Sequence, residues 1–526
     1  MRGKILFLCT LASAMTVTSA CAAQTATPPV TRFHFDQKPG PYAVGLKVVE
    51  QYDYSRTWGS QIDELGKPVE GERARPLQTL IWYPAAKTAA KPMTVGDYFK
   101  LLETETSFGK PRLAGQWVTW KTGMADAMGD SLWAVRDASA APGRYPVVVY
   151  TPSFGVMSWE NADLCEYLAS NGYVVLAAGA LGANSRSMTM DIAGITAQAR
   201  DVSFLVGYAH TLPDADTSEV AVAGFSWGGI VNLFAAARDS RIRALVALDG
   251  SMRYFPGLIK DAGDVHPERM TIPLLFFAQG GMTLEDQDRY LTSPDSRGPS
   301  ALNAWTHGDL ELVFMPGMVH QECSSMDQRN EETWKDFPMM EHADFTRADG
   351  IVGYAWIARY TLAFLNANLK QDAEALKWLK RSPAENGVPL HVFGASFRAG
   401  SGIAPSAESF RVELGRRGFD HIDEVYADFH KANPDFKLAE AEVNAWGYSL
   451  LVGGHQPESI AVLRLNTEIY PDSGNTYDSL GDAYAATGRN ELAIESYKKA
   501  VATHFPMAAL SQEKLDKLEK AQPAAK

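Results

Sequence analysis

The sequence predicts an α/β protein with a doubly wound, mostly parallel β-sheet, followed by an all-α region of helical repeats. Two observations predict the sheet: short, nearly continuous apolar runs recur between residues 41 and 369, and amphipathic stretches lie between them. A third observation predicts the helical region, because one pattern of aromatic residues, glycine and alanine recurs after 34 residues near the C-terminus. A chain of 526 residues has room for both units.

Eight apolar runs are the predicted strands. They are residues 43–51, 77–84, 145–152, 172–179, 219–225, 242–249, 272–280 and 310–317. The later runs lack polar alternation, so we expect helices on both faces of the sheet. Predicted helices are residues 160–172, residues 196–210, the stretch that follows the fifth strand, and residues 353–369.

Residues 1–23 are expected to be an export signal. Arg2 and Lys4 supply a positive start, residues 5–17 are apolar, and small residues fill the cleavage zone at 19–23. Cys21 completes a loose version of a bacterial lipoprotein site that lacks the usual leucine, so we favour simple cleavage over lipidation. The mature protein is expected to be secreted or periplasmic, and to contact a membrane only if Cys21 is lipidated.

The mature chain divides into an α/β domain at 24–375, a linker at 376–409 and helical repeats at 410–520. An insertion at 85–144 separates the second and third strands and is rich in aromatic residues and methionine. It is interpreted either as a cover over an apolar substrate pocket or as a peripheral helical layer with a small core of its own. We favour the second interpretation.

The repeats match the tetratricopeptide pattern. The matching residues are Tyr477, Leu480, Gly481, Tyr484, Ala493, Tyr497 and Ala500, with Trp446, Gly447, Leu450, Leu463 and Pro471 one period earlier. Phe429 and Ala432 remain in phase and suggest a degenerate third unit. The repeats are expected to be structural, or to bind a protein or peptide partner.

Charge and cysteine content limit the function further. The net charge of −13 and the lack of a basic cluster argue against nucleic-acid binding. No cysteine and histidine spacing resembles a zinc site, and we expect neither a metal nor an organic cofactor. Cys165 and Cys323 remain in the mature chain, where an oxidising compartment would allow a disulfide.

Ser226 is the candidate nucleophile. It lies in the G-x-S-x-G sequence "GFSWG", directly after a predicted strand and directly before a predicted helix. A strand, a tight turn and a helix are the context that exposes a strained serine at the edge of a sheet. A serine hydroxyl also needs a base, and His320 follows the last strand more directly than His307 or His342.

The base in turn needs a carboxylate, for which the residues leave two positions open. Asp249 ends the sixth strand, and a carboxylate that closes an apolar strand is costly to bury unless it is paired. Glu285 or Asp286 follows the seventh strand, which is the more usual location. Either choice keeps the chain order serine, acid, histidine.

Four segments, "GFSWGG", "ALVALDGSMRYFP", "IPLLFFAQG" and "MPGMVHQECSSMD", together resemble the platelet-activating-factor acetylhydrolase branch of the α/β-hydrolases, which is related to dienelactone hydrolases. The resemblance spans about residues 41–369, outside the insertion and the repeats. It implies the α/β-hydrolase fold, the catalytic set Ser226, Asp249 and His320, and an ester substrate of the phospholipid type.

Two backbone N–H groups are expected to stabilise the oxyanion, those of Trp227 and Phe154. The resembled family usually has His-Gly before the second donor, whereas this chain has Pro152-Ser153. Tyr254 and Phe255 suggest a hydrophobic substrate portion.

The predicted function is therefore an exported serine ester hydrolase that acts on a small-molecule ester, with a short acyl group or a phospholipid-type substrate. Two alternatives remain. One is a serine peptidase of the prolyl-oligopeptidase type, although the chain lacks room for its propeller domain before residue 41. The other is a non-catalytic tetratricopeptide scaffold.

Overall fold

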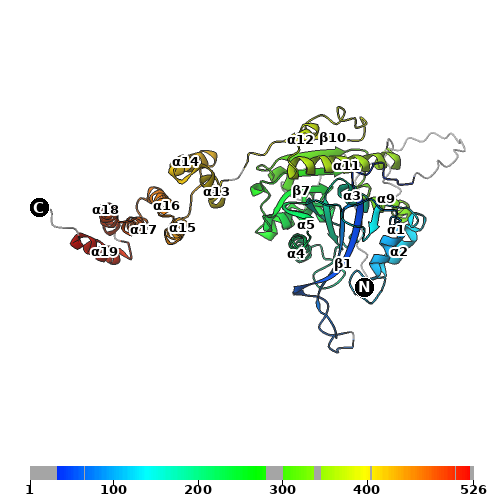
Figure 1. Cartoon of the computed structure of the whole chain (residues 1–526), viewed down its shortest axis with the longest axis horizontal. Coiled ribbons are helices and arrows are strands. Elements are labelled where there is room, and N and C mark those ends of the chain that lie inside the picture. The colour runs from blue at the N-terminus through cyan, green and yellow to red at the C-terminus, as the bar shows by residue number, and fades with distance from the viewer. Residues whose placement is uncertain are drawn as a thin grey trace, which may run out of the picture.

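The computed structural model describes residues 32–63, 65–279, 300–336, 345–402, 405–503 and 505–521. Within these residues one sheet has the strand order β10-β9-β8-β7-β6-β4-β5-β2-β1-β3 (Figure 1). The strands are β1 (Ala43–Thr57), β2 (Ala74–Ala85), β3 (Ala134–Arg136), β4 (Tyr145–Thr151), β5 (Val174–Ala178), β6 (Ala215–Phe225), β7 (Ile242–Leu248), β8 (Leu274–Gln279), β9 (Leu310–Met315) and β10 (Gly394–Arg398). All eight predicted strands are confirmed, as β1, β2 and β4 to β9.

The middle of the sheet is parallel, as predicted. Strands β5, β4, β6, β7, β8 and β9 pair in parallel, while β2 pairs antiparallel with β1 and β5, and β10 pairs antiparallel with β9. The chain runs from β4 outward to β5 on one side and then returns to place β6 on the other side of β4. At such a switch point the loops after neighbouring parallel strands diverge and leave room for a ligand.

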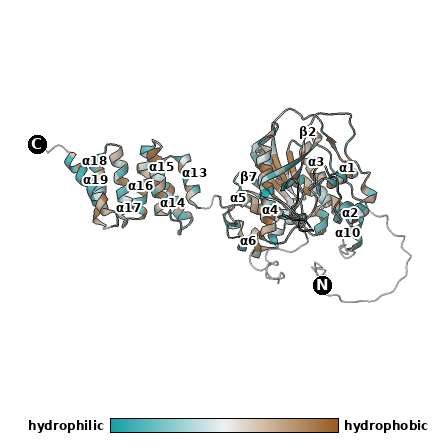
Figure 2. Ribbon diagram, turned by 90° about the horizontal axis from the view of Figure 1, so that it is seen from below, coloured by the Kyte–Doolittle hydropathy of each residue, from teal (hydrophilic) through white to brown (hydrophobic). Residues whose placement is uncertain are grey.

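Helices cover both faces of the sheet. α3 (Ala162–Ser170) and α11 (Arg347–Leu369) pack in one buried cluster, and α4 (Ile192–Ala209), α5 (Trp227–Arg238) and α6 (Pro256–Ala262) pack in the other. Figure 2 shows the apolar residues concentrated in the strands and in the helix faces turned toward them. Strands buried on both faces explain why their sequences are continuously apolar.

The insertion forms α1 (Val95–Lys100), α2 (Gln116–Gly123), the 3-10 turns η1 (Leu101–Glu103) and η2 (Ala125–Ala127), and the edge strand β3. The expectation of a separate small core is wrong, because Tyr98, Phe99 and Trp117 belong to the same buried cluster as the sheet face. Trp82 of β2 donates its Nε1–H to the Tyr98 hydroxyl at 2.7 Å. The insertion thus covers an apolar face of the sheet and is part of the main core.

The segment expected to be a linker, residues 376–409, contains the end of α12 (Ala373–Leu379) and the strand β10. The sheet therefore extends past the predicted end of the α/β domain. Composition concealed this strand, because a five-residue edge strand in a Gly- and Ser-rich segment has little apolar periodicity.

The C-terminal region is helical. Its helices are α13 (Ala407–Arg417), α14 (Ile422–Ala432), α15 (Glu440–Val452), α16 (Gln456–Ile469), α17 (Gly474–Ala486), α18 (Asn490–Ala502) and α19 (Ala508–Ala521). They follow one another as an elongated row (Figure 1). A Cβ on Gly447 would lie 2.5 Å from Leu463, and a Cβ on Gly481 would lie 2.5 Å from Tyr497. The same close helix approach therefore recurs after 34 residues.

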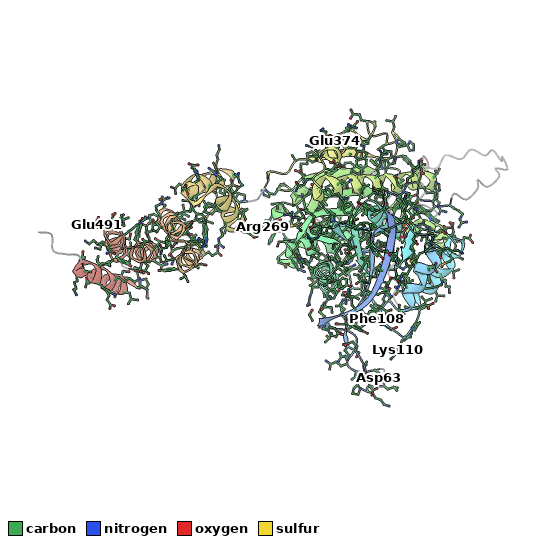
Figure 3. The ribbon with its side chains drawn as sticks, viewed as in Figure 1. Asp63, Phe108, Lys110, Arg269, Glu374 and Glu491 are labelled. Carbon is green, nitrogen blue, oxygen red and sulfur yellow. The ribbon has the colours of Figure 1, made fainter. Side chains whose placement is uncertain are left out.

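Short elements complete the described chain. They are η3 (Ser251–Arg253), η4 (Pro267–Arg269), α8 (Ala301–Ala304), η6 (His320–Cys323), α9 (Ser325–Arg329), α10 (Glu331–Asp336) and η8 (Phe419–His421). The connection between β1 and β2 projects from the body, with Asp63 near its tip (Figure 3). No helix in the described ranges combines the length and the apolar character needed to cross a membrane.

Candidate active site

Ser226 lies in the turn between β6 and α5, with φ 52° and ψ −118°. A side-chain-bearing residue rarely adopts this conformation, so the surrounding structure must enforce it. The Ser226 N–H donates to the Leu248 carbonyl at 3.0 Å, and the Ser226 carbonyl accepts from the Gly229 and Ser251 N–H groups at 3.0 and 2.7 Å. These bonds tie the turn to the end of β7 and to the residues that follow it.

Two glycines allow this turn to pack. A Cβ on Gly228 would lie 2.2 Å from the Thr151 carbonyl oxygen, and a Cβ on Gly229 would lie 2.6 Å from the Gly250 Cα. Both neighbours are backbone atoms, which cannot move aside without disturbing β4 or the end of β7. The start of α5 therefore lies directly against the ends of both neighbouring strands.

The structure brings the three residues Ser226, His320 and Asp249 into one hydrogen-bonded line. His320 Nε2 lies 2.8 Å from Ser226 Oγ, and His320 Nδ1 lies 2.6 Å from Asp249 Oδ2. Because a carboxylate accepts hydrogen bonds, Nδ1 carries the proton and Nε2 is free to accept from the serine hydroxyl. The Asp249 side chain is fully buried, whereas about a third of the His320 side chain is exposed, at 32%.

Asp249 is held by partners other than His320. Its Oδ1 accepts from the Tyr254 hydroxyl at 2.8 Å and from the Gln279 N–H at 3.3 Å. Burial, and then the negative charge of Asp249, raise the pKa of Tyr254 well above its usual value. The hydroxyl of Tyr254 therefore donates a hydrogen bond to the Asp249 carboxylate. The sequence alone suggests only an apolar contact with substrate for Tyr254.

The alternative residues are placed elsewhere or lie beyond the described chain. Glu285, Asp286 and His342 lie outside the described residues. His307 is half-buried, and its Nδ1 lies 3.0 Å from the Gly402 carbonyl oxygen and 2.8 Å from Ser401 Oγ. Its described hydrogen bonds thus connect it to the segment after β10 and not to Ser226.

The two predicted oxyanion donors flank the switch point. Trp227 begins α5 directly after Ser226, and Phe154 lies in the loop after β4. Neither backbone N–H donates a hydrogen bond to any residue that the structure describes. Their rings meet edge to face with centroids 5.6 Å apart, and the Trp227 ring meets Phe255 at 5.8 Å. These three aromatic side chains form one cluster, in which Trp227 is buried and Phe154 is exposed.

The loop after β4 is anchored by residues that sequence reasoning missed. The Gly155 carbonyl accepts from Arg186 Nη2 at 3.1 Å and from Gln116 Nε2 at 3.3 Å. Arg186 pairs with the buried Glu105 at 2.6 Å and lies over the Trp117 ring. The insertion thus supports the site, although no local motif connects residue 105 with residue 186.

The two described cysteines, Cys165 and Cys323, are free and buried. Burial raises the pKa of the Cys165 thiol and of the Cys323 thiol well above the usual value. The allowed disulfide does not form in this structure. Among the described residues no group of three or more His, Cys, Asp or Glu side chains could hold a metal ion.

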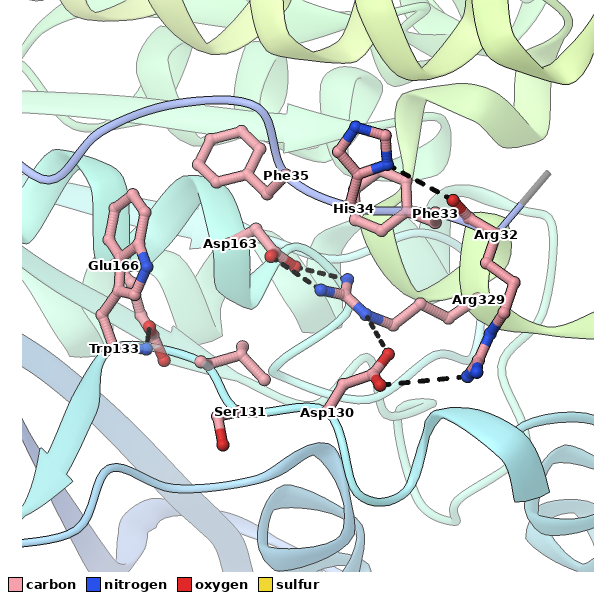
Figure 4. A pocket seen from close by; sticks show the side chains of 11 residues that line it. Arg32, Phe33, His34, Phe35, Asp130, Ser131, Trp133, Asp163, Glu166 and Arg329 are labelled. Atoms are coloured by element: carbon pink, nitrogen blue, oxygen red, sulfur yellow. Dashed lines mark hydrogen bonds and ion pairs between the residues drawn. The ribbon is translucent and has the colours of Figure 1, made fainter.

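A separate cavity of about 490 Å³ lies against the first described residues (Figure 4). Its lining includes Arg32, Asp163 and Arg329. Ser226, Asp249 and His320 do not line it. Arg329 pairs with Asp163 at 2.6 Å, and Glu166 accepts hydrogen bonds from the backbone. The charges of this cavity are thus satisfied by the protein itself.

The chain is similar to one family of known proteins and to a solved structure. Residues 133–277 match the model of the Dienelactone hydrolase family, a range that contains Ser226 and Asp249 but ends before His320. Among solved structures, the chain is similar to the ferulic acid esterase from Streptomyces cinnamoneus, with 19% identity and a TM-score of 0.47, over 69% of this chain and 98% of that chain. No curated protein matches the chain. The family match supports a hydrolase built on an α/β-hydrolase-like sheet.

Proposed function

We propose that this protein is a serine ester hydrolase in which Ser226 is the nucleophile, His320 the base and Asp249 the residue that orients the base. One observation carries the proposal: His320 lies 2.8 Å from the Ser226 hydroxyl and 2.6 Å from the Asp249 carboxylate at the same time. The family match over residues 133–277 supports the reaction class.

In the proposed reaction, Ser226 Oγ attacks the ester carbonyl while its proton passes to His320 Nε2. The buried carboxylate of Asp249 stabilises the imidazolium that forms. The carbonyl oxygen becomes an oxyanion that accepts from the Trp227 and Phe154 N–H groups. His320 then returns the proton to the leaving alcohol, and water cleaves the acyl-enzyme by the same steps in reverse.

The exposed ring of Phe154, which packs against the buried Trp227, favours an ester with a hydrophobic portion. The finer substrate class is tested with a panel: p-nitrophenyl esters of increasing acyl length, a phospholipid with a short acyl chain, methyl ferulate and an amide. The proposal expects turnover of at least one ester. Cleavage of the amide alone would instead assign a peptidase.

Labelling with a fluorophosphonate tests the nucleophile. We expect the wild type to be labelled and Ser226→Ala to be unlabelled, with matching thermal unfolding. Ser251→Ala is a suitable control, because Ser251 lies beside the same turn but its hydroxyl is not part of the hydrogen-bonded line. An unlabelled, folded wild type contradicts the proposal.

We further propose that the chain is exported through residues 1–23, and that α13 to α19 are tetratricopeptide-type repeats with a role in support or in partner binding. The 34-residue recurrence of the glycine contacts at Gly447 and Gly481 supports the repeat assignment. Fractionation of cells that express the full chain, followed by mass spectrometry of the mature N-terminus, tests export, cleavage and lipidation at Cys21.

A further inference from the structure

A buried carboxyl group is bonded directly to the loop that carries the proposed oxyanion donor. Glu160 is fully buried, and its Oε2 accepts from the Ser153 backbone N–H at 2.8 Å and from the Tyr150 hydroxyl at 3.2 Å. Its Oε1 is hydrogen-bonded to the Ser153 hydroxyl. One side chain thus contacts both the backbone and the side chain of Ser153, the residue directly before Phe154.

These contacts leave Phe154 between two anchored neighbours. Ser153 is held by Glu160, and Gly155 is held through its carbonyl by Arg186 and Gln116. The Ser153 N–H is occupied by Glu160, so the Phe154 N–H is the donor left for a ligand in this part of the loop. A peptide unit fixed at both ends keeps its N–H direction during the reaction, which is the requirement for oxyanion stabilisation.

The contacts of Glu160 match a neutral carboxylic acid. Oε2 accepts from the Ser153 N–H and the Tyr150 hydroxyl, and Oε1 accepts from the Ser153 hydroxyl. The same arrangement fits a neutral acid, because the Ser153 hydroxyl oxygen can instead accept a hydrogen bond from a protonated Oε1. The Tyr150 hydroxyl accepts from Asn161 Nδ2 at 2.7 Å, so its own proton points to Glu160. No described cation contacts the Glu160 carboxyl group.

Titratable groups around Glu160 shift its pKa in opposite directions, because the negative charge of Asp327 raises the pKa and the hydrogen bond from Tyr150 lowers it. They are Tyr150 on β4, Asp327 on α9 and Tyr354 on α11, whose hydroxyl donates to Asn161 instead. Burial, and then the negative charge of Asp327, raise the pKa of Glu160 to about 8. Burial also raises the pKa of Asp327 to about 7.

We propose that Glu160 is a positioning residue which, as a neutral acid, fixes the loop so that the Phe154 N–H faces the oxyanion formed at Ser226. This inference rests on the proposed ester-hydrolase function. The resembled family usually has His-Gly before the second oxyanion donor, whereas this chain has Pro152-Ser153. Here the side chain of Glu160 restrains the backbone of Ser153. Loss of its proton places a negative charge beside the developing oxyanion, which lowers the rate.

The test compares Glu160→Gln and Glu160→Ala with the wild type, using p-nitrophenyl acetate from about pH 6 to about pH 10. A glutamine can accept through its oxygen and donate to Ser153 through its NH₂, as the neutral acid does, but it cannot ionise. We expect wild-type kcat to fall as pH rises past about 8. We expect Glu160→Gln to keep kcat near pH 7 within roughly a factor of five, because neutral hydrogen bonds replace one another, and to lack this alkaline fall. We expect Glu160→Ala to lose kcat by about 10- to 100-fold, because the donor is misplaced.

Glu166→Gln is the matched control. Glu166 is also buried, accepts from the Tyr98 hydroxyl and the Ala134 N–H, and has a pKa raised by burial to about 8. Its partners lie on the insertion and not on the loop after β4, so Glu166→Gln should keep the alkaline fall of the wild type. Thermal unfolding of every variant verifies that each is folded.

The outcomes separate this inference from the function on which it rests. If the folded wild type neither reacts with a fluorophosphonate nor cleaves any ester, both proposals are overturned. If the wild type is active but Glu160→Gln keeps the same alkaline fall, or is as inactive as Glu160→Ala, only the role of Glu160 is overturned. Full activity of Glu160→Ala would also overturn only the role of Glu160.

Discussion

Replacement of Asp249 by asparagine tests the proposed charge and hydrogen-bond arrangement with little change in shape. The carboxylate gives one oxygen to His320 Nδ1 and the other to the Tyr254 hydroxyl and the Gln279 N–H. If the new NH₂ group faces His320, Nδ1 must accept a hydrogen bond, so the imidazole proton moves to Nε2. The base then presents an N–H to Ser226 and cannot accept the serine proton. If the NH₂ group turns the other way, it meets the Gln279 N–H, which is also a donor.

The expected loss follows from the distances. An imidazolium and a carboxylate whose nearest atoms are 2.6 Å apart have charge centres about 4 Å apart, which at an effective dielectric constant of about 20 corresponds to about 4 kcal/mol. This energy amounts to about 10³ in rate. The wrong imidazole tautomer adds to it, so we expect kcat to fall by about 10⁴ in Asp249→Asn, the size of the effect that this exchange has in a serine protease triad.

Steady-state cleavage of p-nitrophenyl acetate measures this loss, with thermal unfolding as the test of folding. Tyr254→Phe is the matched control, because it removes one hydrogen bond to Asp249 and keeps both the charge and the tautomer. We expect about a 10-fold loss for Tyr254→Phe, the value of one hydrogen bond to a charged group. A folded Asp249→Asn variant within tenfold of the wild type would refute the assigned role of Asp249, as would equal losses in the two variants.

Three further predictions concern stability and reactivity. Gly228→Ala should unfold at a lower temperature and lose activity, because its Cβ would lie 2.2 Å from the Thr151 carbonyl oxygen; an unchanged melting temperature contradicts this. Burial raises the pKa of Glu311 to about 7, so the native state holds this proton more tightly than the unfolded chain, and stability should fall as pH rises from about 4.5 to about 7. The shift corresponds to about 3 kcal/mol, and denaturant titrations should show that Glu311→Gln reduces the pH-dependent loss of stability by about this amount, while Glu160, Glu166 and Asp327 continue to contribute. The thiols of Cys165 and Cys323 should react with a thiol reagent only after unfolding, and rapid reaction of the native protein would contradict their burial.

Sequence reasoning reached the parts of the molecule that local patterns encode. A strand buried on both faces is apolar along its whole length, and this property identifies β4 to β9 without any long-range information. Parallel strands deliver their carboxyl ends to one edge, so residues that end strands, such as Asp249, could be expected near Ser226. The choice of Asp249 over Glu285 came from the family resemblance, because strand position alone allowed both. The structure adds the hydrogen bond from His320 to Asp249, whereas Glu285 lies beyond the described residues.

The remaining features depend on contacts between residues far apart in the sequence, or on chemistry that a residue type does not reveal. Strand β10 is fixed by pairing with β9, since its own sequence has almost no apolar period. A glutamate at position 160 looks like an ordinary residue at the start of an amphipathic helix, which usually faces solvent. Only burial beside Tyr150 and Ser153 turns it into a group that can hold a proton near neutral pH. Ser153 stands where the resembled family usually has glycine, and its hydroxyl and backbone N–H are the groups that the buried Glu160 contacts.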